Sequence, residues 1–131
     1  MPQNTFTKEE RLCHKRDISS LFAKGIYFYV QGIKTIWHPN EKNHPYPVRL
    51  VISVPKRNFK HAVDRNTIKR LIRESWRCNK NAFYEFLLDK NVCLDLGFVF
   101  TGKSIPSFKQ VDDKILLILQ QLMSDYEKNI R

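Results

Sequence analysis

Residues 55–80 read PKRNFKHAVDRNTIKRLIRESWRCNK, a stretch with nine Lys or Arg side chains against one Asp and one Glu. Its basic residues recur every four positions, at Arg65, Lys69, Arg73 and Arg77. This spacing places them along one side of a helix. The opposite side has the spacing of a buried stripe, formed by Ile68, Leu71, Ile72, Ser75 and Trp76. The stretch therefore predicts a helix with one core face and one cationic face.

The limits of this helix follow from its flanks. Asp64 stands at a position that suits an N-cap, which predicts a helix from about Arg65 to Asn79 or a little further. Upstream, residues 48–54 alternate apolar and other side chains as a half-buried strand does. The basic stretch thus begins as a loop that leads from this strand into the helix.

The remaining elements are read outward from this strand and helix. Residues 15–24 predict a helix that stops at Gly25, residues 27–37 a strand, and residues 92–101 another strand. The turn-rich residues 38–47 suggest a hairpin between the strands at 27–37 and 48–54. A last helix is expected to begin near Ser107, with an apolar stripe of Val111, Ile115, Ile118, Leu119, Leu122, Met123 and Tyr126.

The predicted order is αββαβα, which indicates an α+β fold, a two-layer sandwich of helices on one open sheet. A length of 131 residues suits one domain, and the polar residues 1–14 are expected to form a loosely held, flexible arm. Trp37 and Trp76 are expected to pack internally.

The formal net charge of +10 is unevenly distributed, because residues 1–80 carry +11 and residues 81–131 carry −1. Such an asymmetry favours a polyanionic partner and salt-dependent binding. We expect a cytoplasmic protein, since no apolar run is long enough for a membrane span and the first residues lack the hydrophobic segment of a signal peptide.

Motifs for catalysis are missing from the sequence. His14, His38, His44 and His61 lie in polar or turn segments without a neighbouring nucleophile, and we expect solvent-exposed side chains without a catalytic role. The three cysteines form no CxxC pair, so we expect reduced thiols and no zinc site. The four glycines are too far apart for a phosphate-binding loop. We therefore predict neither a catalytic residue nor a metal ligand.

The segment VDRNTIKRLIRESWR, following ISVPKRNFKHA, resembles the signature of the protein subunit of bacterial ribonuclease P. The matching positions are Arg65, Asn66, Lys69, Arg70, Leu71, Ile72 and Arg73. Thr67 departs from the pattern, because the family usually has Arg there. Upstream, KEERLCHKRDISSLFAKG resembles the family's basic arm and first helix, in which Phe22 fits and Ile18 replaces a Phe. The resemblance extends over about residues 8–101.

This resemblance implies a division of labour between an RNA and a protein. A large catalytic RNA would hydrolyse the phosphodiester bond with Mg²⁺, and the protein would bind that RNA and the single-stranded 5′ leader of precursor tRNA. The family resemblance further implies a left-handed βαβ crossover, an exception to the usual hand, in a fold like the second domain of ribosomal protein S5. We expect a monomer in a 1:1 complex with the RNA.

The resemblance and the charge pattern together give candidate site residues. For RNA binding they are Lys56, Arg57, Lys60, Arg65, Asn66, Lys69, Arg70, Arg73 and Arg77. Asn66 is also a candidate ligand for a metal-bound water. For the leader they are Ile18, Phe22, Lys34 and Ile36, although Phe22 and Ile36 would suit an ordinary core equally well. The alternative for the cationic face is a merely solvated helix surface.

Two other classes of protein share this composition. A structural protein that binds ribosomal RNA would have a similar basic helix, and the motif rather than the charge separates it from the ribonuclease P subunit. A sequence-specific DNA-binding protein would need Asn or Gln beside Arg on the exposed face, and usually a dimer. Only Asn66 meets that need, and no dimerisation heptad is present, so this alternative ranks third.

Overall fold

The computed structural model describes residues 6–40 and 45–129. Four strands form a single sheet in the order β1-β2-β4-β3. The elements, in chain order, are a short 3-10 helix η1 (Lys8–Glu10), α1 (Lys15–Lys24), β1 (Ile26–Val30), β2 (Ile33–Asn40), β3 (Val48–Ser53), α2 (Ala62–Asn79), α3 (Asn81–Asp89), β4 (Cys93–Phe100) and α4 (Phe108–Asn129).

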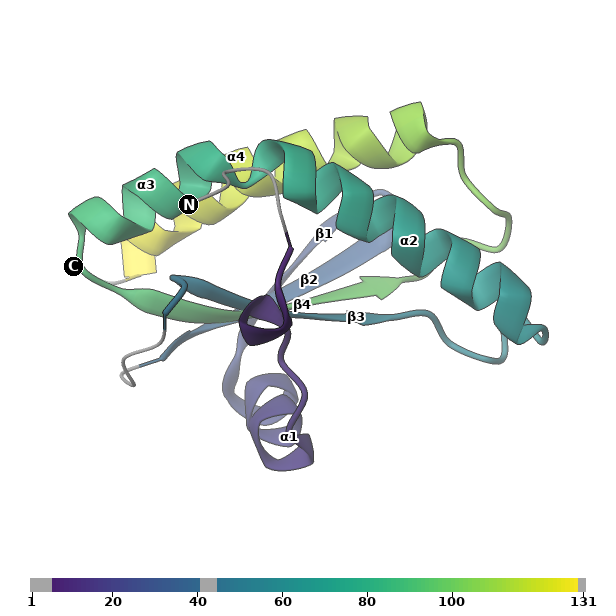
Figure 1. The fold of residues 1–131 in the computed structure, drawn as a ribbon, viewed down its shortest axis with the longest axis horizontal. Coiled ribbons are helices and arrows are strands. Elements are labelled where there is room, and N and C mark those ends of the chain that lie inside the picture. The colour runs from purple at the N-terminus through teal and green to yellow at the C-terminus, as the bar shows by residue number, and fades with distance from the viewer. Residues whose placement is uncertain (1–5, 41–44, 130–131) are drawn as a thin grey trace.

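The helices are divided unequally between the two faces of the sheet. Figure 1 shows α2, α3 and α4 above one face, here called the helical face, and α1 below the other, here called the α1 face. This arrangement confirms the predicted α+β class of helices on one open sheet. Among the described helices, none has the length and apolar character needed to cross a membrane.

The connection from β3 to β4 is the βαβ unit expected from the family resemblance. These two strands are neighbours and run parallel, with Val48 opposite Leu94 and Ser53 opposite Val99. In Figure 1 the chain leaves β3, crosses the helical face through α2 and α3, and returns to β4 behind β3, which makes the crossover left-handed. The loop that leads into α2 therefore lies at one end of the sheet.

The strand expected at residues 27–37 is two strands, because the chain turns back at Gln31–Gly32. Gly32 has a φ of +80°, a conformation that glycine adopts without steric strain. The hairpin therefore joins β1 to β2, and the predicted hairpin between residues 27–37 and 48–54 is wrong. Strand β4 lies between β2 and β3 and pairs antiparallel with β2. Residues 41–44 of the predicted turn lie outside the described residues.

Helix α2 begins three residues earlier than predicted. Its first residue is Ala62 and its N-cap is His61, so Asp64 lies in the first turn and is not the N-cap. There its carboxylate still lies near the positive end of the helix dipole. Of the predicted stripe, Ile68, Ile72, Ser75 and Trp76 are fully buried and Leu71 is half-buried.

The sequence reading missed α3, which follows α2 after the single residue Lys80. Its buried side chains are Phe83, Tyr84 and Leu87. An i, i+1, i+4 spacing of this kind is typical of a short amphipathic helix, and nine residues offer few turns over which to recognise it.

The last helix and its apolar stripe agree with the prediction. The hydroxyl of Ser107 accepts from the N–H of Gln110 at 3.2 Å, and the Gln110 side chain accepts from the N–H of Ser107 at 2.9 Å. This reciprocal pair is a capping box that fixes the start of α4. Asp112 in its first turns accepts hydrogen bonds from Ser75 and Asn79, which ties α4 to α2.

The main core lies between the sheet and the helical face. Trp37 and Trp76 are both fully buried in it, as predicted. The rings of Trp76 and Phe98 pack edge to face, with their centroids 5.8 Å apart. A smaller core of Leu12, Leu21 and Ile36 lies under α1. Gly97 leaves room for this core, since a Cβ there would come within 2.9 Å of the Ile36 side chain of β2 and 3.4 Å of the Leu21 side chain of α1.

The N-terminal segment is held against the domain from Phe6 onward, which corrects the expectation of a loose arm for the described part of residues 1–14. Glu10 and Leu12 are buried, and the N–H of Leu12 donates to the carbonyl of Leu50 in β3 at 2.9 Å. Arg11 forms a bridge with the same residue of β3. Residues 1–5 of the predicted arm lie outside the described residues.

Candidate nucleic-acid interface

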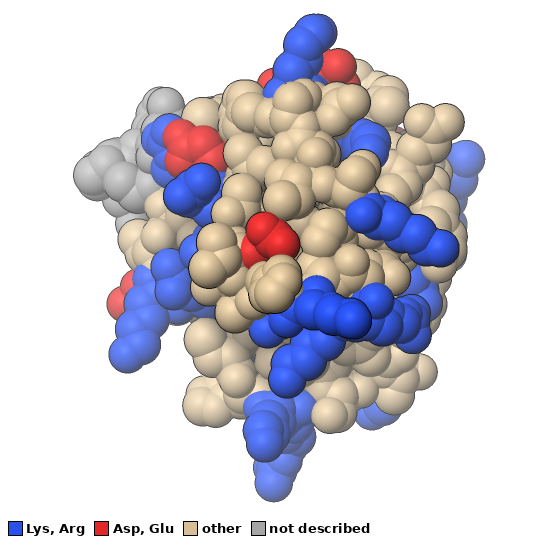
Figure 2. All heavy atoms as spheres, turned by 90° about the vertical axis from the view of Figure 1, so that its right-hand side faces the viewer, with Lys and Arg blue, Asp and Glu red and all other residues tan. Residues whose placement is uncertain are grey.

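Basic side chains gather at the end of the molecule where α2 begins. Figure 2 looks onto this end and shows Lys and Arg side chains forming a band with little acidic surface among them. The β3–α2 loop and α2 contribute most of the predicted set. We call six of these residues the basic surface: Lys56, Arg57, Lys60, Lys69, Arg70 and Arg73.

The basic surface has no acidic partners in the part of the chain that the structure describes. Across residues 6–40 and 45–129, none of its six cations forms an ion pair. Lys56, Arg57, Lys60 and Arg70 are exposed, while Lys69 and Arg73 are half-buried at the edge of α2. Asn66 is exposed on the same turn of the helix as Arg70. The surface therefore presents uncompensated positive charge on a rigid helix, which an anionic ligand would neutralise.

Two predicted RNA-binding residues are engaged within the protein. The guanidinium of Arg65 donates to the backbone carbonyls of Phe59 at 2.8 Å and Lys60 at 3.0 Å, so it braces the β3–α2 loop. Arg77 is paired with Glu74, and this hydrogen bond raises the pKa of Arg77 and lowers that of Glu74. The structure thus separates Arg65 and Arg77 from the unpaired cations.

Thr67 occupies the position at which the family pattern has Arg. Its hydroxyl donates to the carbonyl of Val63 one turn earlier, at 2.9 Å. The hydroxyl therefore has its hydrogen-bond partner within α2, and the side chain adds no charge to the basic surface.

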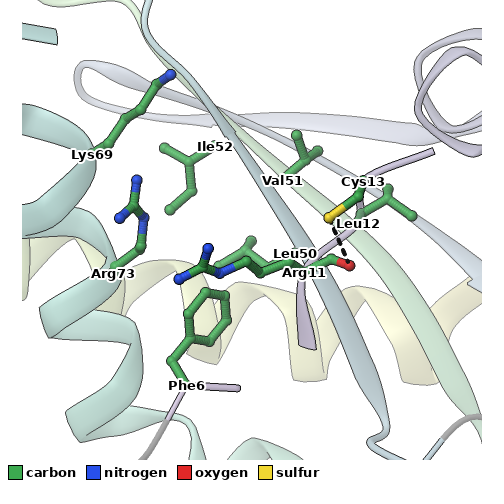
Figure 3. Close-up of a pocket in the computed structure, with 9 residues that line it drawn as sticks. All are labelled: Phe6, Arg11, Leu12, Cys13, Leu50, Val51, Ile52, Lys69 and Arg73. Carbon is green, nitrogen blue, oxygen red and sulfur yellow. Dashed lines mark hydrogen bonds between the residues drawn. The ribbon is translucent and has the colours of Figure 1, made fainter. Parts of the chain in front are cut away.

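A residue that the sequence reading missed completes one edge of this surface. Arg11 lies in a hollow of about 160 Å³ together with Lys69 and Arg73. Figure 3 shows the guanidinium groups of Arg11 and Arg73 facing the same space, with the ring of Phe6 beside Arg11. Burial, followed by the positive charge of Arg11, lowers the pKa of Arg73. The only sequence signal for Arg11 was its place in a basic arm.

The predicted leader residues lie on the α1 face, but they are not equivalent. Ile18 and Phe22 are half-buried against the small core under α1. Ile36 is fully buried in that core, so the structure supports the core alternative for Ile36 and removes it from the accessible surface. Lys34 is half-buried, with its ammonium 4.5 Å from the ring centre of Tyr27. The accessible part of the predicted group is Ile18, Phe22 and Lys34.

Two tyrosines extend this accessible part. Tyr27 and Tyr29 alternate with core residues along β1, so both side chains point to the α1 face and are exposed. The hydroxyl of Tyr27 donates to the carbonyl of Phe22, which joins β1 to the end of α1. The alternation in residues 26–30 was the signal for these rings, and it was obscured because the hairpin had been read as one strand.

The sheet also carries a cation of a different kind, Arg49 of β3. Its guanidinium donates to the two carboxylate oxygens of Asp95 at 3.0 and 3.2 Å and contacts Asp17 of α1 at 3.4 Å. This network fastens α1 to the sheet and leaves Arg49 little free charge.

The described residues contain no group of three or more His, Cys, Asp or Glu side chains that could hold a metal ion. His14 and His61 are exposed, His38 is half-buried, and His44 lies outside the described residues. The cysteines form no disulfide. Among the described residues, these side chains supply no fitting donor set for Mg²⁺.

Comparison with known proteins identifies relatives over most of the chain. The family model for ribonuclease P matches residues 6–121. The ribonuclease P protein component of Petrotoga mobilis is 34% identical over 125 residues, which cover 93% of this chain and 98% of that protein. The one from Porphyromonas gingivalis is 28% identical over 106 residues, covering 81% of this chain and 77% of that protein.

Solved structures agree on the fold. The RNase P protein of Staphylococcus aureus superposes with a TM-score of 0.67 at 22% identity, covering 86% of this chain and 94% of that chain. The RNase P protein of Thermotoga maritima gives a TM-score of 0.66 at 24% identity, covering 86% and 96%. Together with the match of the family model to residues 6–121, these relatives show that the chain belongs to the ribonuclease P protein family.

Proposed function

We propose that this protein binds the RNA of ribonuclease P through its basic surface and so assists removal of the 5′ leader from precursor tRNA. The observation that supports this most directly is a set of six cations on α2 and the loop before it, none of which has an acidic partner among the described residues. Unpaired Arg and Lys side chains on a helix can follow an RNA backbone, and Arg can engage a phosphate with two parallel hydrogen bonds.

We propose a second RNA contact, with the single-stranded leader, on the α1 face. The rings of Phe22, Tyr27 and Tyr29 lie on this face, and the ammonium of Lys34 lies against the ring of Tyr27. Aromatic side chains stack on unpaired bases of any sequence, and a neighbouring cation attracts the backbone. Such a surface suits a leader, because leaders differ in sequence between precursors.

In this proposal the protein contributes binding and the RNA contributes the chemistry. Hydrolysis of the phosphodiester bond, with Mg²⁺, is assigned to the RNA, and we propose one protein for each RNA in the cytoplasm. Neutralisation of RNA phosphates by the basic surface would reduce the need for free Mg²⁺ as a counterion. The protein would thus have its largest effect when Mg²⁺ is scarce.

The test is cleavage of a precursor tRNA by a bacterial ribonuclease P RNA at low Mg²⁺, with and without this protein. We expect cleavage to be strongly stimulated by the protein and to yield the mature 5′ end. The variant K56Q/R57Q/K60Q lacks three exposed cations of the loop. We expect it to stimulate cleavage less than the wild-type protein does at the same Mg²⁺ concentration. A folded wild-type protein that leaves cleavage unchanged would contradict the proposal.

A further inference from the structure

The N-terminal segment is fixed by a buried charged cluster. Glu10 is fully buried, and its carboxylate accepts hydrogen bonds from Lys80, between α2 and α3, and from the hydroxyl of Tyr84 in α3. Lys80 is itself 3% exposed. Burial raises the pKa of Tyr84, so its hydroxyl stays protonated and continues to donate. We call Glu10, Lys80 and Tyr84 the buried cluster.

The buried cluster joins parts of the chain that are distant in sequence. Glu10 and Lys80 are 70 residues apart, and the pair connects the segment before α1 to the junction of α2 and α3. A buried ion pair contributes little net stability, but it strongly favours one arrangement of its partners, because either charge left alone would be costly. The cluster therefore specifies where residues 7–11 lie.

The adjacent Arg11 is positioned by this arrangement. Its backbone is bridged to Leu50 of β3, and its guanidinium lies 5.6 Å from the centre of the Phe6 ring. The same ring lies 5.9 Å from the ammonium of Lys80, so Phe6 connects the buried cluster to Arg11. Arg11 is thereby directed into the hollow that it shares with Lys69 and Arg73 (Figure 3).

Three cations converge on this hollow without a carboxylate among its lining residues. In the described part of the chain, Arg11, Lys69 and Arg73 form no ion pair. Mutual repulsion of like charges that line one hollow is unfavourable unless an anion is placed between them. The volume of the hollow, about 160 Å³, and its cationic, partly apolar lining suit a single phosphodiester group.

We propose that Arg11, Lys69 and Arg73 form a binding site for one backbone phosphate of RNA, and that the buried cluster acts as a positioning device that holds Arg11 in this site. The inference rests on the proposed function and deepens it, because it adds a residue outside α2 and explains how that residue is placed.

The experiment measures the salt dependence of RNA binding, since each lost phosphate contact reduces the slope of log K against log salt by about 0.7–0.9. R11Q should lower the slope by this amount. E10Q/K80M should lower it equally, although it keeps the net charge of the protein and all three cations of the site. The combined variant R11Q/E10Q/K80M should show no further loss, because both changes remove the same contact.

Control variants separate this effect from loss of charge or of fold. K128Q removes one exposed cation in the last turn of α4 and should leave the slope unchanged. Y84F removes only the hydroxyl that donates to Glu10. It should reduce the salt slope as E10Q/K80M does, but by a smaller amount. Circular dichroism monitors folding, and Y84F carries the test of the buried cluster if E10Q/K80M does not fold.

Two binding measurements distinguish the source of the phosphate. A lower slope for R11Q with ribonuclease P RNA alone assigns the phosphate to that RNA. A lower slope only when the assembled complex binds a precursor with its leader, and not a leaderless tRNA, assigns it to the leader. A wild-type slope for R11Q in both measurements would overturn the site, and wild-type slopes for E10Q/K80M and Y84F would overturn the positioning role. Cleavage of precursor tRNA, measured in parallel at low Mg²⁺, keeps the two proposals apart: stimulation by the wild-type protein would show that the proposed function stands even then.

Discussion

Arg49 in the sheet and the arginines of α2 use positive charge in opposite ways. On the α1 face, Arg49 is 11% exposed and shares its guanidinium between Asp95 and Asp17. On the other side of the molecule, Arg70 and Arg73 project from α2 and have no ion pair among the described residues. Both groups consist of the same side-chain types, but only the second leaves charge available to a ligand.

This difference shows why a count of basic residues is a poor guide to a binding surface. A guanidinium that donates to two carboxylates has satisfied its donors and its charge, and its removal chiefly affects folding. An unpaired guanidinium contributes little to stability and much to attraction of a polyanion. Mutations of the paired Arg49 network and of the unpaired arginines of α2 should therefore separate stability from binding of ribonuclease P RNA.

The largest effect on RNA binding is expected for R70E/R73E. Reversal of both charges removes two candidate phosphate contacts. The slope of log K against log salt should therefore become shallower by about two units, and the affinity near 0.1 M salt should decrease by about a hundredfold. The unfolding midpoint in urea should stay near that of the wild type, because neither side chain has an acidic partner to lose. The measurement is filter binding of ribonuclease P RNA over a series of salt concentrations.

An unchanged slope in R70E/R73E would contradict direct phosphate contact by these two residues. The matched control is K90E/K128E, which reverses two exposed charges away from the basic surface. Equal losses in both double mutants would show that affinity follows net charge rather than this surface.

The opposite outcome is expected for Asp95→Asn on the α1 face. The variant removes the negative charge that Asp95 presents to Arg49, so that Asp17, at 3.4 Å, is the only carboxylate left beside this guanidinium among the described residues. Because the network is largely buried, we expect a loss of about 2 kcal/mol in the free energy of unfolding. Urea denaturation measures this loss. The salt slope of RNA binding should not change.

Asp89→Asn, an exposed position at the end of α3, is the matched control and should leave stability near the wild-type value. A stable Asp95→Asn protein with a reduced salt slope would break the distinction between paired and unpaired cations.

The elements with a clear period were predictable from the sequence. The core stripe of α2 and the apolar stripe of α4 follow the helical repeat, and α1, β3 and β4 lie within about one residue of their predicted limits. The hairpin was misassigned because strand pairing depends on a partner distant in sequence, here β4, which no local pattern reveals. Gly32 was the one local signal for the β1–β2 turn.

The site was predictable to the extent that it lies on one helix. Lys69, Arg70 and Arg73 follow from their spacing on α2, whereas the pairing of Arg77 and the burial of Ile36 depend on neighbours in space. Arg11 was missed for the same reason, since its position depends on an ion pair between Glu10 and Lys80. Sequence reading thus identified the chemistry of the surface but not which cations were free.

A smaller effect is expected for Phe22→Ala, which tests the α1 face as a leader surface. The ring is half-buried, so truncation should remove one stacking partner and weaken binding of a leader-bearing precursor by about 1 kcal/mol, or about fivefold. Binding of mature tRNA should stay unchanged, because it has no leader. Affinities of the assembled complex for the two substrates measure the difference.

Phe22→Leu serves as the control for packing, because it keeps an apolar side chain against the core under α1 while removing the ring. If Phe22→Ala lowers the affinity for precursor and for mature tRNA equally, Phe22 acts as a core residue and the stacking proposal is wrong. Recovery of stability but not of precursor affinity in Phe22→Leu would support stacking.

The smallest effect is expected for Arg77→Gln, which lies on the same helix as Arg73 but is paired with Glu74. Because the exposed pair is neutral as a whole, loss of Arg77 should reduce the salt slope by clearly less than Arg73→Gln does, although each variant removes one positive charge. Side-by-side salt titrations with ribonuclease P RNA measure the two slopes. Equal slopes would mean that Arg77 exchanges Glu74 for a phosphate when RNA binds, and the pairing seen in the free protein would then not predict which cations contact RNA. A nearly wild-type slope for Arg77→Gln beside a reduced one for Arg73→Gln would show that the acidic partner, rather than the place on the helix, determines which arginine binds.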